Sequence, residues 1–163
     1  MQAGKRVTAT GQRGFSWLLV LLVLMVLAVA SAAGAAVAQR WSDQMAREKE
    51  RQLLRVGDAF ARALADYHAS SPGSDKRFPP TLEQLVLDTR FVGTRRHLRT
   101  IYPDPLTGQP DWVLVRDARG DIFGIRSRAE QQPWVRVPQR LGATDLPAAQ
   151  RYAEWIFTPR QPS

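Results

Sequence analysis

The most distinctive pattern in the chain is a run without any charged residue at positions 14–39. Leucine and valine dominate its first part, and alanine dominates its second part. A helix needs roughly 20 consecutive apolar residues to cross the hydrocarbon core of a bilayer. The run exceeds that length, so the sequence predicts that residues 15–39 form the transmembrane half of an N-terminal helix.

The pattern changes at residue 40 from uniformly apolar to amphipathic. Between residues 40 and 69, apolar side chains recur at helical intervals, at Met45, Leu53, Val56, Phe60, Leu64 and Tyr67. Such spacing indicates a single buried helix face. No proline occurs in residues 15–69, and the segment SSPGSDK at 70–76 is typical of a helix end. We therefore expect one continuous helix that leaves the membrane and becomes the central helix of a small domain.

The segment after this helix predicts a second, much shorter helix and then a loop. FPPTLEQLVLD at 78–88 combines a turn with an apolar helical face. Thr81 is expected to cap this helix, with Gln84 three residues later as in a capping box. Residues 90–112 are rich in proline and glycine, so they predict an extended loop with turns.

The C-terminal part of the chain predicts strands. Two strand-like segments flank the turn ARGD and together indicate a β-hairpin at 112–127. WVRV at 134–137 predicts a third strand, and residues 147–157 predict another short helix. The predicted fold class is therefore α+β, with a long N-terminal helix packed on a small antiparallel sheet.

Composition and charge limit the classes of function. The chain has 163 residues, 23 basic and 15 acidic residues, and no cysteine, so it has neither disulfides nor thiolate metal sites. Lys5, Arg6 and Arg13 precede the apolar run, and no acidic residue does. By the positive-inside rule the N-terminus is expected in the cytoplasm. The remaining excess of basic residues is small, so no nucleic-acid partner is expected.

A cleaved signal peptide is the main alternative for the apolar run. A basic start, an apolar segment and the tripeptide AVA at 36–38 fit a secretory signal that is cut after Ala38. The chain would then be an exported binding protein, or a membrane-anchored one if it stayed uncut. The same segment contains Ala30, Gly34 and Ala38, which are spaced four residues apart. Small residues at this spacing allow close packing of membrane helices.

Two stretches of the chain resemble the pseudopilins of type II secretion, within the type IV pilin-like class. The first is a short basic leader that ends at Gly14 and is followed directly by Phe15 and the apolar helix. The second, at 77–127, runs from a Pro-Thr-Leu helix through a DPLTG loop to a tryptophan-containing hairpin that ends in Ile-Arg-Ser. Together they cover more than half of the chain.

The resemblance implies a processing pathway, a location and a set of partners. A prepilin peptidase would cut after Gly14 and the new N-terminal Phe15 would be methylated. Residues 1–14 would be the leader, and residues 40–163 a periplasmic pilin-like domain on a single-pass inner-membrane anchor. The expected partners are prepilin peptidase, other pseudopilins and the inner-membrane secretion platform. A minor subunit of a type IV pilus is the related alternative.

The chain departs from the family pattern at two places. The family carries glutamate at the fifth residue after the cut, where this chain has Leu19. In the family, that carboxylate is thought to neutralise the N-terminal ammonium of a neighbouring subunit, since a charge inside the membrane needs a partner. Major pseudopilins also often hold calcium in an acidic C-terminal loop, but the acidic residues after residue 127 of this chain are widely spaced. We therefore expect no bound metal.

No residue pattern in the chain indicates catalysis, so we expect a structural protein without catalytic residues or cofactors. His68 and His97 lack motif partners and are expected at the surface. The arginines of TRRHLR at 94–99 are expected in a solvated loop, and Asp104, which precedes a proline, in a turn. Trp112 and Trp134 are expected to pack in the core or against the hairpin.

Overall fold

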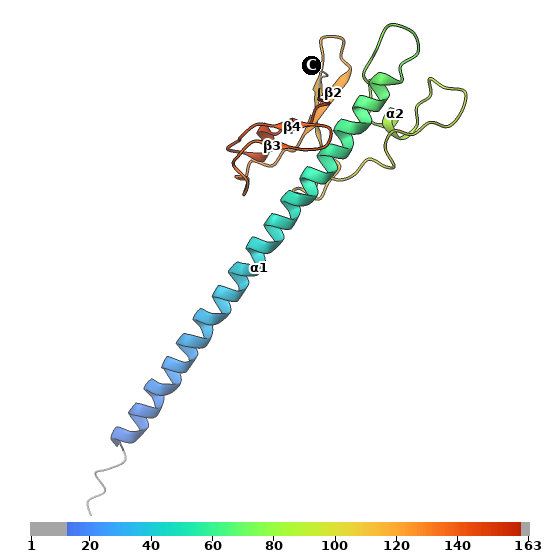
Figure 1. Cartoon of the computed structure of the whole chain (residues 1–163). Coiled ribbons are helices and arrows are strands. Elements are labelled where there is room, and N and C mark those ends of the chain that lie inside the picture. Colours follow the sequence, from blue (N-terminus) through green and yellow to red (C-terminus); the bar gives the residue numbers. More distant parts are fainter. Residues whose placement is uncertain (1–12, 161–163) are drawn as a thin grey trace, which may run out of the picture. The chain divides into compact units, whose positions relative to one another are not determined.

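The computed structural model describes the backbone of residues 13–160 and the side chains of residues 17–31 and 37–160. The elements follow one another as α1 (Arg13–Ala69), α2 (Glu83–Val86), β1 (Val113–Arg116), β2 (Ile122–Arg126), β3 (Gln139–Arg140), β4 (Asp145–Leu146) and the 3₁₀ helix η1 (Tyr152–Glu154) (Figure 1). The chain divides into two compact units, Met1–Met45 and Ala46–Ser163. The fold class is α+β, as predicted.

The long helix α1 confirms the prediction of one continuous helix. At the end of the helix, the backbone N–H of Ser70 donates a hydrogen bond to the carbonyl of Asp66. The backbone N–H of Ser71 donates to the carbonyl of His68. Gly73 then turns the chain with a φ of 73°, a left-handed conformation that glycine adopts without steric cost. The predicted break at residues 70–76 is therefore correct.

The C-terminal part of α1 is the centre of the hydrophobic core. Of its predicted apolar face, Leu53, Phe60, Leu64 and Tyr67 are buried. Met45 is exposed, so its place on the buried face was wrong. Gly57 allows close packing on the same helix, because a Cβ atom there would collide with the ring of Phe157. The helix thus meets the C-terminal segment at a position where no larger residue fits.

The predicted hairpin is confirmed. β1 and β2 pair antiparallel, with Leu114 opposite Ile125, and the register shifts between Val115 and Arg116. Outside the hairpin, Ile125 of β2 exchanges two backbone hydrogen bonds with Phe157. β3 and β4 form a separate two-stranded sheet, so the single small sheet that we expected is two small sheets.

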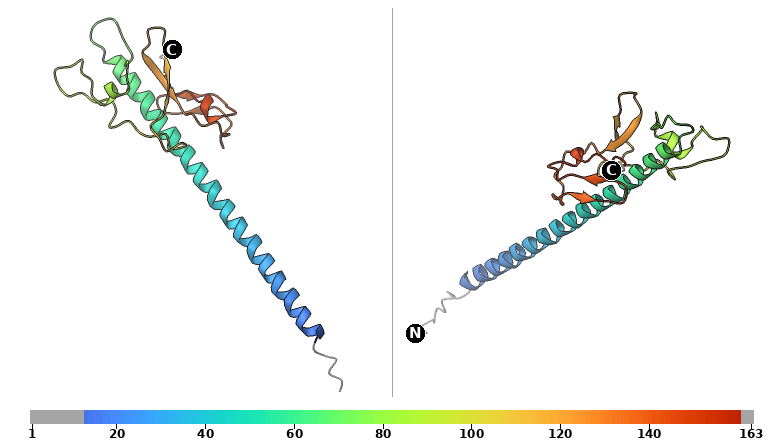
Figure 2. Two further views of the ribbon diagram at one scale, coloured as in Figure 1. Left: turned by 180° about the vertical axis from the view of Figure 1, so that it is seen from behind. Right: turned by 45° about the horizontal axis from the view of Figure 1, so that its top comes forward.

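The elements of the unit Ala46–Ser163 surround the last turns of α1. Figure 1 shows both sheets beside these turns, and the views in Figure 2 place α2 and its loop on a different side from the strands. Long loops supply much of the buried surface, because Trp112, Trp155 and Phe157 lie in the core outside the named strands and helices.

Two predicted elements differ from the structure. Residues 134–137 form no strand, because Pro133 and Pro138 flank them and the backbone N–H groups of Trp134 and Val135 bond the carboxylate of Glu50 instead. The helix expected at 147–157 is only the short η1.

The predicted capping box is also wrong. α2 begins after Leu82 and has no side-chain cap. Gln84, which we expected to complete that cap, instead accepts a hydrogen bond from the hydroxyl of Tyr67. This side chain therefore connects α2 to α1, and the loop at 90–112, which contains no helix or strand, follows as predicted.

Candidate functional site

The predicted processing and packing residues lie along the N-terminal part of α1. Gly14 and Phe15 lie in its first turn, and their side chains fall outside the described residues. Ala30 and Ala38 are exposed, and Gly34 also lies in the helix, at a position whose surroundings are not described. Predicted leader residues 1–12 lie outside the described part of the chain.

The side chains of this helical segment face outward without contacts that bury them. Every residue from 17 to 31 is exposed, and the exposed set includes large apolar side chains. Those side chains are Trp17, Leu18, Leu19, Val20, Leu21, Leu22, Val23, Leu24, Met25, Val26, Leu27 and Val29. Within the part of the chain that the structure describes, no helix is both long enough and apolar enough to cross a membrane.

A buried carboxylate lies where α1 enters the unit Ala46–Ser163. Glu50 is only 3% exposed. Its side chain accepts hydrogen bonds from the Tyr152 hydroxyl at 2.7 Å and from the backbone N–H groups of Trp134 at 2.7 Å and Val135 at 3.3 Å. A buried charge needs such donors, because it has lost its hydration. Glu50 thereby joins the helix to two segments that follow it by more than eighty residues.

The same contact changes the acidity of Tyr152. Burial, followed by the hydrogen bond to Glu50, raises the pKa of the Tyr152 phenol above its usual value. The phenol therefore stays protonated and remains a hydrogen-bond donor to the carboxylate at physiological pH. The Glu50–Tyr152 pair is a stable structural link rather than a proton-transfer pair.

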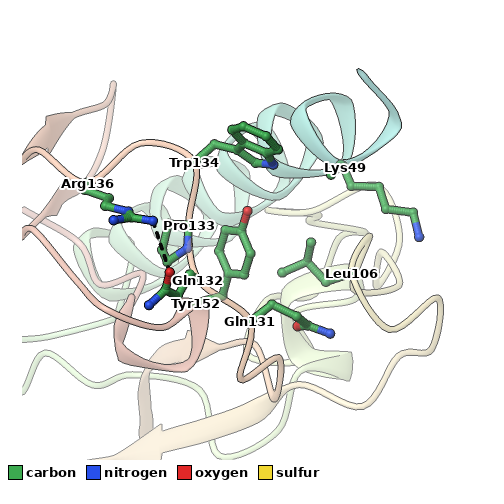
Figure 3. A pocket seen from close by; sticks show the side chains of 9 residues that line it. Lys49, Leu106, Gln131, Gln132, Pro133, Trp134, Arg136 and Tyr152 are labelled. Atoms are coloured by element: carbon green, nitrogen blue, oxygen red, sulfur yellow. Dashed lines mark hydrogen bonds between the residues drawn. The ribbon is translucent and has the colours of Figure 1, made fainter. Parts of the chain in front are cut away.

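A pocket of about 660 Å³ opens beside this link. We call it the Trp134 pocket, and its walls are Ala46, Lys49, Leu106, Gln131, Gln132, Pro133, Trp134, Arg136 and Tyr152. Figure 3 shows Lys49 and Arg136 toward opposite ends, with Tyr152 and Leu106 between them. Arg136 donates a hydrogen bond to Gln132 at 3.0 Å. The volume of the Trp134 pocket lies within the usual range for sites that bind small molecules or short peptide segments.

The outer part of the pocket is formed by Trp134. This side chain is 44% exposed, so the prediction that it packs in the core or against the hairpin was wrong. The guanidinium of Arg47 lies 4.6 Å from the centre of its ring, a cation–π contact. Trp112, in contrast, is buried as predicted and donates from its indole N–H to the carbonyl of Tyr102 at 2.7 Å.

A second polar cluster surrounds Asp88, whose side chain is fully buried. Arg90 donates to both of its carboxylate oxygens, at 2.9 and 2.7 Å, and His97 Nε2 lies 3.0 Å from Oδ2. The hydrogen bonds from Arg90, and then from His97, hold the pKa of Asp88 well below its usual range. Arg90 also donates to the Tyr67 carbonyl at 3.0 Å and to Ser71 Oγ at 2.8 Å.

This cluster corrects the prediction for His97. Its side chain is 3% exposed rather than at the surface, because it packs on the ring of Tyr67 and against Asp88. Asp88 holds Arg90 and His97 within the loop after α2, and the bonds from Arg90 to Tyr67 and Ser71 connect this loop to the end of α1. We therefore interpret it as a structural connection. Arg95, Arg96 and Arg99 of the same loop are exposed, as predicted.

The predictions for His68 and Asp104 have different outcomes. His68 is half-buried and stacks on Phe78, with ring centres 4.5 Å apart, so it is not simply a surface residue. Asp104 forms the expected turn, since it accepts from the Leu106 N–H at 2.9 Å. It is also completely buried and bonded to the hydroxyl of Ser127. Among the described residues, no group of three or more His, Cys, Asp or Glu side chains is placed to hold a metal ion.

Comparisons with known proteins give no independent guide to function: no family model, curated protein or solved structure matches the chain. Sequence reasoning also missed the Trp134 pocket and the Glu50 link. Glu50 stands in a run of charged residues, which predicts an exposed position. Nothing in the sequence pairs it with residues 134, 135 and 152.

Proposed function

We propose that the protein is a structural, pseudopilin-like subunit of a type II secretion system. The observation that carries the proposal is the helix Arg13–Ala69, whose segment 17–31 presents exposed side chains, nearly all apolar, and whose C-terminal part is the core helix of an α+β unit. Exposed apolar surface of this extent needs lipid or other helices around it. Both are supplied when such a helix is inserted in a membrane and then packed among its neighbours.

The proposed mechanism is mechanical and uses no catalytic residue. The subunit is inserted with its N-terminus in the cytoplasm, cut after Gly14 by prepilin peptidase and methylated on Phe15. Its helix packs against those of other pseudopilins above the inner-membrane platform, with Ala30, Gly34 and Ala38 at the close contacts. The unit Ala46–Ser163 lies in the periplasm. Leu19 in place of glutamate favours a minor or specialised position in the assembly.

An exported or membrane-anchored binding protein is the second candidate function. The Trp134 pocket favours it, because a purely structural subunit has no need of a pocket of this size that is lined by aromatic and cationic side chains. Cleavage after Ala38 would release this protein, and an uncut chain would keep it anchored. A minor subunit of a type IV pilus is a variant of the first candidate with the same processing and helix packing.

Helix packing is tested by disulfide cross-linking, since the chain has no cysteine of its own. We expect Ala30→Cys, expressed with a pseudopilin that carries a cysteine introduced in the facing part of its membrane helix, to give cross-linked species of higher mass when membranes of a host with a complete secretion system are oxidised. The matched control is Ala118→Cys, which lies exposed in the turn of the hairpin. Equal cross-linking of the two variants, or none with Ala30→Cys, would contradict assembly through this helix.

A further inference from the structure

Several basic residues of the unit Ala46–Ser163 form no ion pair with another described residue, and three of them gather at the Trp134 pocket. Arginines at many other positions form ion pairs with aspartate or glutamate, as Arg62 does with Asp58 and Arg160 with Asp145. Arg47, Lys49 and Arg136 form no ion pair with any residue of the described chain. Two of these three cations line the pocket, and the third lies on its tryptophan.

The charged groups of the pocket are hydrogen-bond donors only. A guanidinium has five N–H donors, and Arg136 uses one of them on the Gln132 side-chain oxygen. That bond occupies the Gln132 oxygen and leaves its amide N–H groups for a ligand. Lys49 adds an ammonium with three donors. A ligand that fits this arrangement supplies acceptor oxygens and negative charge.

The one carboxylate nearby does not cancel this preference. Glu50 is buried behind Trp134 and Tyr152, and its oxygens accept three hydrogen bonds from these two residues and Val135. The Glu50 carboxylate is therefore stabilised by hydrogen-bond donors within the fold. Arg47, Lys49 and Arg136 therefore remain available to bind an anionic ligand.

The remaining walls indicate which kind of anion fits. Leu106, Pro133, Trp134 and Tyr152 offer apolar and aromatic surface, and Gln131 and Gln132 offer side-chain amides that suit a peptide backbone. Nucleic-acid binding uses a continuous basic stripe, and recruitment to anionic lipid uses clusters of four to eight basic residues. A group of three exposed cations around one open pocket matches neither pattern.

We propose that the Trp134 pocket binds an acidic segment of another polypeptide, with one carboxylate at Lys49, a second at Arg136 and an apolar side chain between them against Trp134. This inference is independent of the proposed pseudopilin function, because it depends only on residues of the unit Ala46–Ser163. It assigns to the chain a specific recognition activity in addition to any role in assembly.

The test is a fluorescence-anisotropy titration of the full chain in zwitterionic detergent. The probe is a short labelled peptide in which glutamates alternate with leucines, and its control has glutamines in place of the glutamates. The pocket variant carries Lys49→Glu with Arg136→Glu. The matched control carries Arg95→Glu with Arg96→Glu, which changes the net charge equally at two exposed arginines outside the pocket.

We expect the wild type to bind the acidic peptide at least about tenfold more tightly than the glutamine peptide, because hydrogen bonds in which both groups are charged are stronger than those to a neutral amide. The affinity should fall as salt is added. The pocket variant should lose this preference and bind a lysine–leucine peptide instead. The Arg95/Arg96 control should bind the acidic peptide as the wild type does.

Several results would overturn the proposal. Equal losses in the two double variants would mean that overall charge, rather than the pocket, attracts the peptide. Tighter binding of a short oligonucleotide or of anionic lipid nanodiscs would assign the cations to those partners. If the glutamate variant lost its near-ultraviolet circular dichroism, the milder pair Lys49→Gln with Arg136→Gln would decide, and unchanged affinity there would refute the site.

Discussion

Replacing Glu50 by alanine is expected to lower the free energy of unfolding of the unit Ala46–Ser163 by about 3 kcal/mol. The change removes the acceptor of the Tyr152 hydroxyl and of the two backbone N–H groups at 134 and 135. A buried donor that is left without an acceptor costs about 1–3 kcal/mol, and partial entry of water reduces the sum. A urea titration of the full chain in detergent, followed by near-ultraviolet circular dichroism, measures the loss.

Glu48→Ala is the matched control for this prediction. Glu48 lies on the same helix two residues earlier, but it is exposed and pairs only with the exposed Arg51 and Arg55. Such surface ion pairs contribute about 0–1 kcal/mol. If Glu50→Ala and Glu48→Ala destabilised the protein to the same small extent, the link between α1 and the segment 134–152 would not have the importance that we assign to it.

Replacing Arg90 by alanine is expected to destabilise the same unit by about 3–5 kcal/mol, as is usual when a buried charge loses its partner. Asp88 is fully buried and depends on Arg90 for two of its hydrogen bonds. The guanidinium also packs on the ring of Tyr67, with its central carbon 3.5 Å from the ring centre. Arg119→Ala serves as the control, because Arg119 forms an exposed pair with Asp75.

The pH dependence of stability provides a second measurement for the Asp88 cluster. The pKa of Asp88 is lowered in the folded state, chiefly by Arg90, so the unfolded chain takes up a proton first as the pH falls. The resulting stabilisation is present above the unfolded pKa of about 4 and is lost as the pH falls below it toward the folded value. Arg90→Ala should flatten this acid dependence. An unchanged slope between pH 5 and pH 3 would contradict the assignment.

The elements that depend on local pattern could be predicted from the sequence. α1 follows from an apolar run, an amphipathic continuation and a proline–glycine break, all of which act within a few turns. The β1–β2 hairpin follows from two strand-like segments around ARGD in the same way. In both cases the residues that decide the structure are neighbours in the sequence.

The elements that depend on distant partners could not be predicted. WVRV at 134–137 has the composition of a strand, but Glu50 on α1 takes the backbone N–H groups that a strand would use. His97 stands among arginines, as a surface residue would, and is buried because Asp88 and Tyr67 lie against it. Neither partner is visible from local spacing.

The candidate functional residues also fall into a group that local sequence predicts and a group that only the fold brings together. The residues of the proposed processing and helix packing, Gly14, Phe15, Ala30, Gly34 and Ala38, were found from a contiguous motif. The Trp134 pocket joins α1 to residues around 106, 131–136 and 152, so only the folded chain brings its walls together. Unpaired cations became recognisable only when the ion pairs of the other arginines were known.

The most direct test of the proposed pseudopilin function is the mature N-terminus. The full-length protein should be purified from membranes of a host with a prepilin peptidase, and from a strain without it, and analysed by intact mass and N-terminal sequencing. We predict a chain that begins at Phe15 and carries one added methyl group only in the strain with the peptidase. A chain that begins at Gln39, or an uncut chain in both strains, would contradict the proposed function.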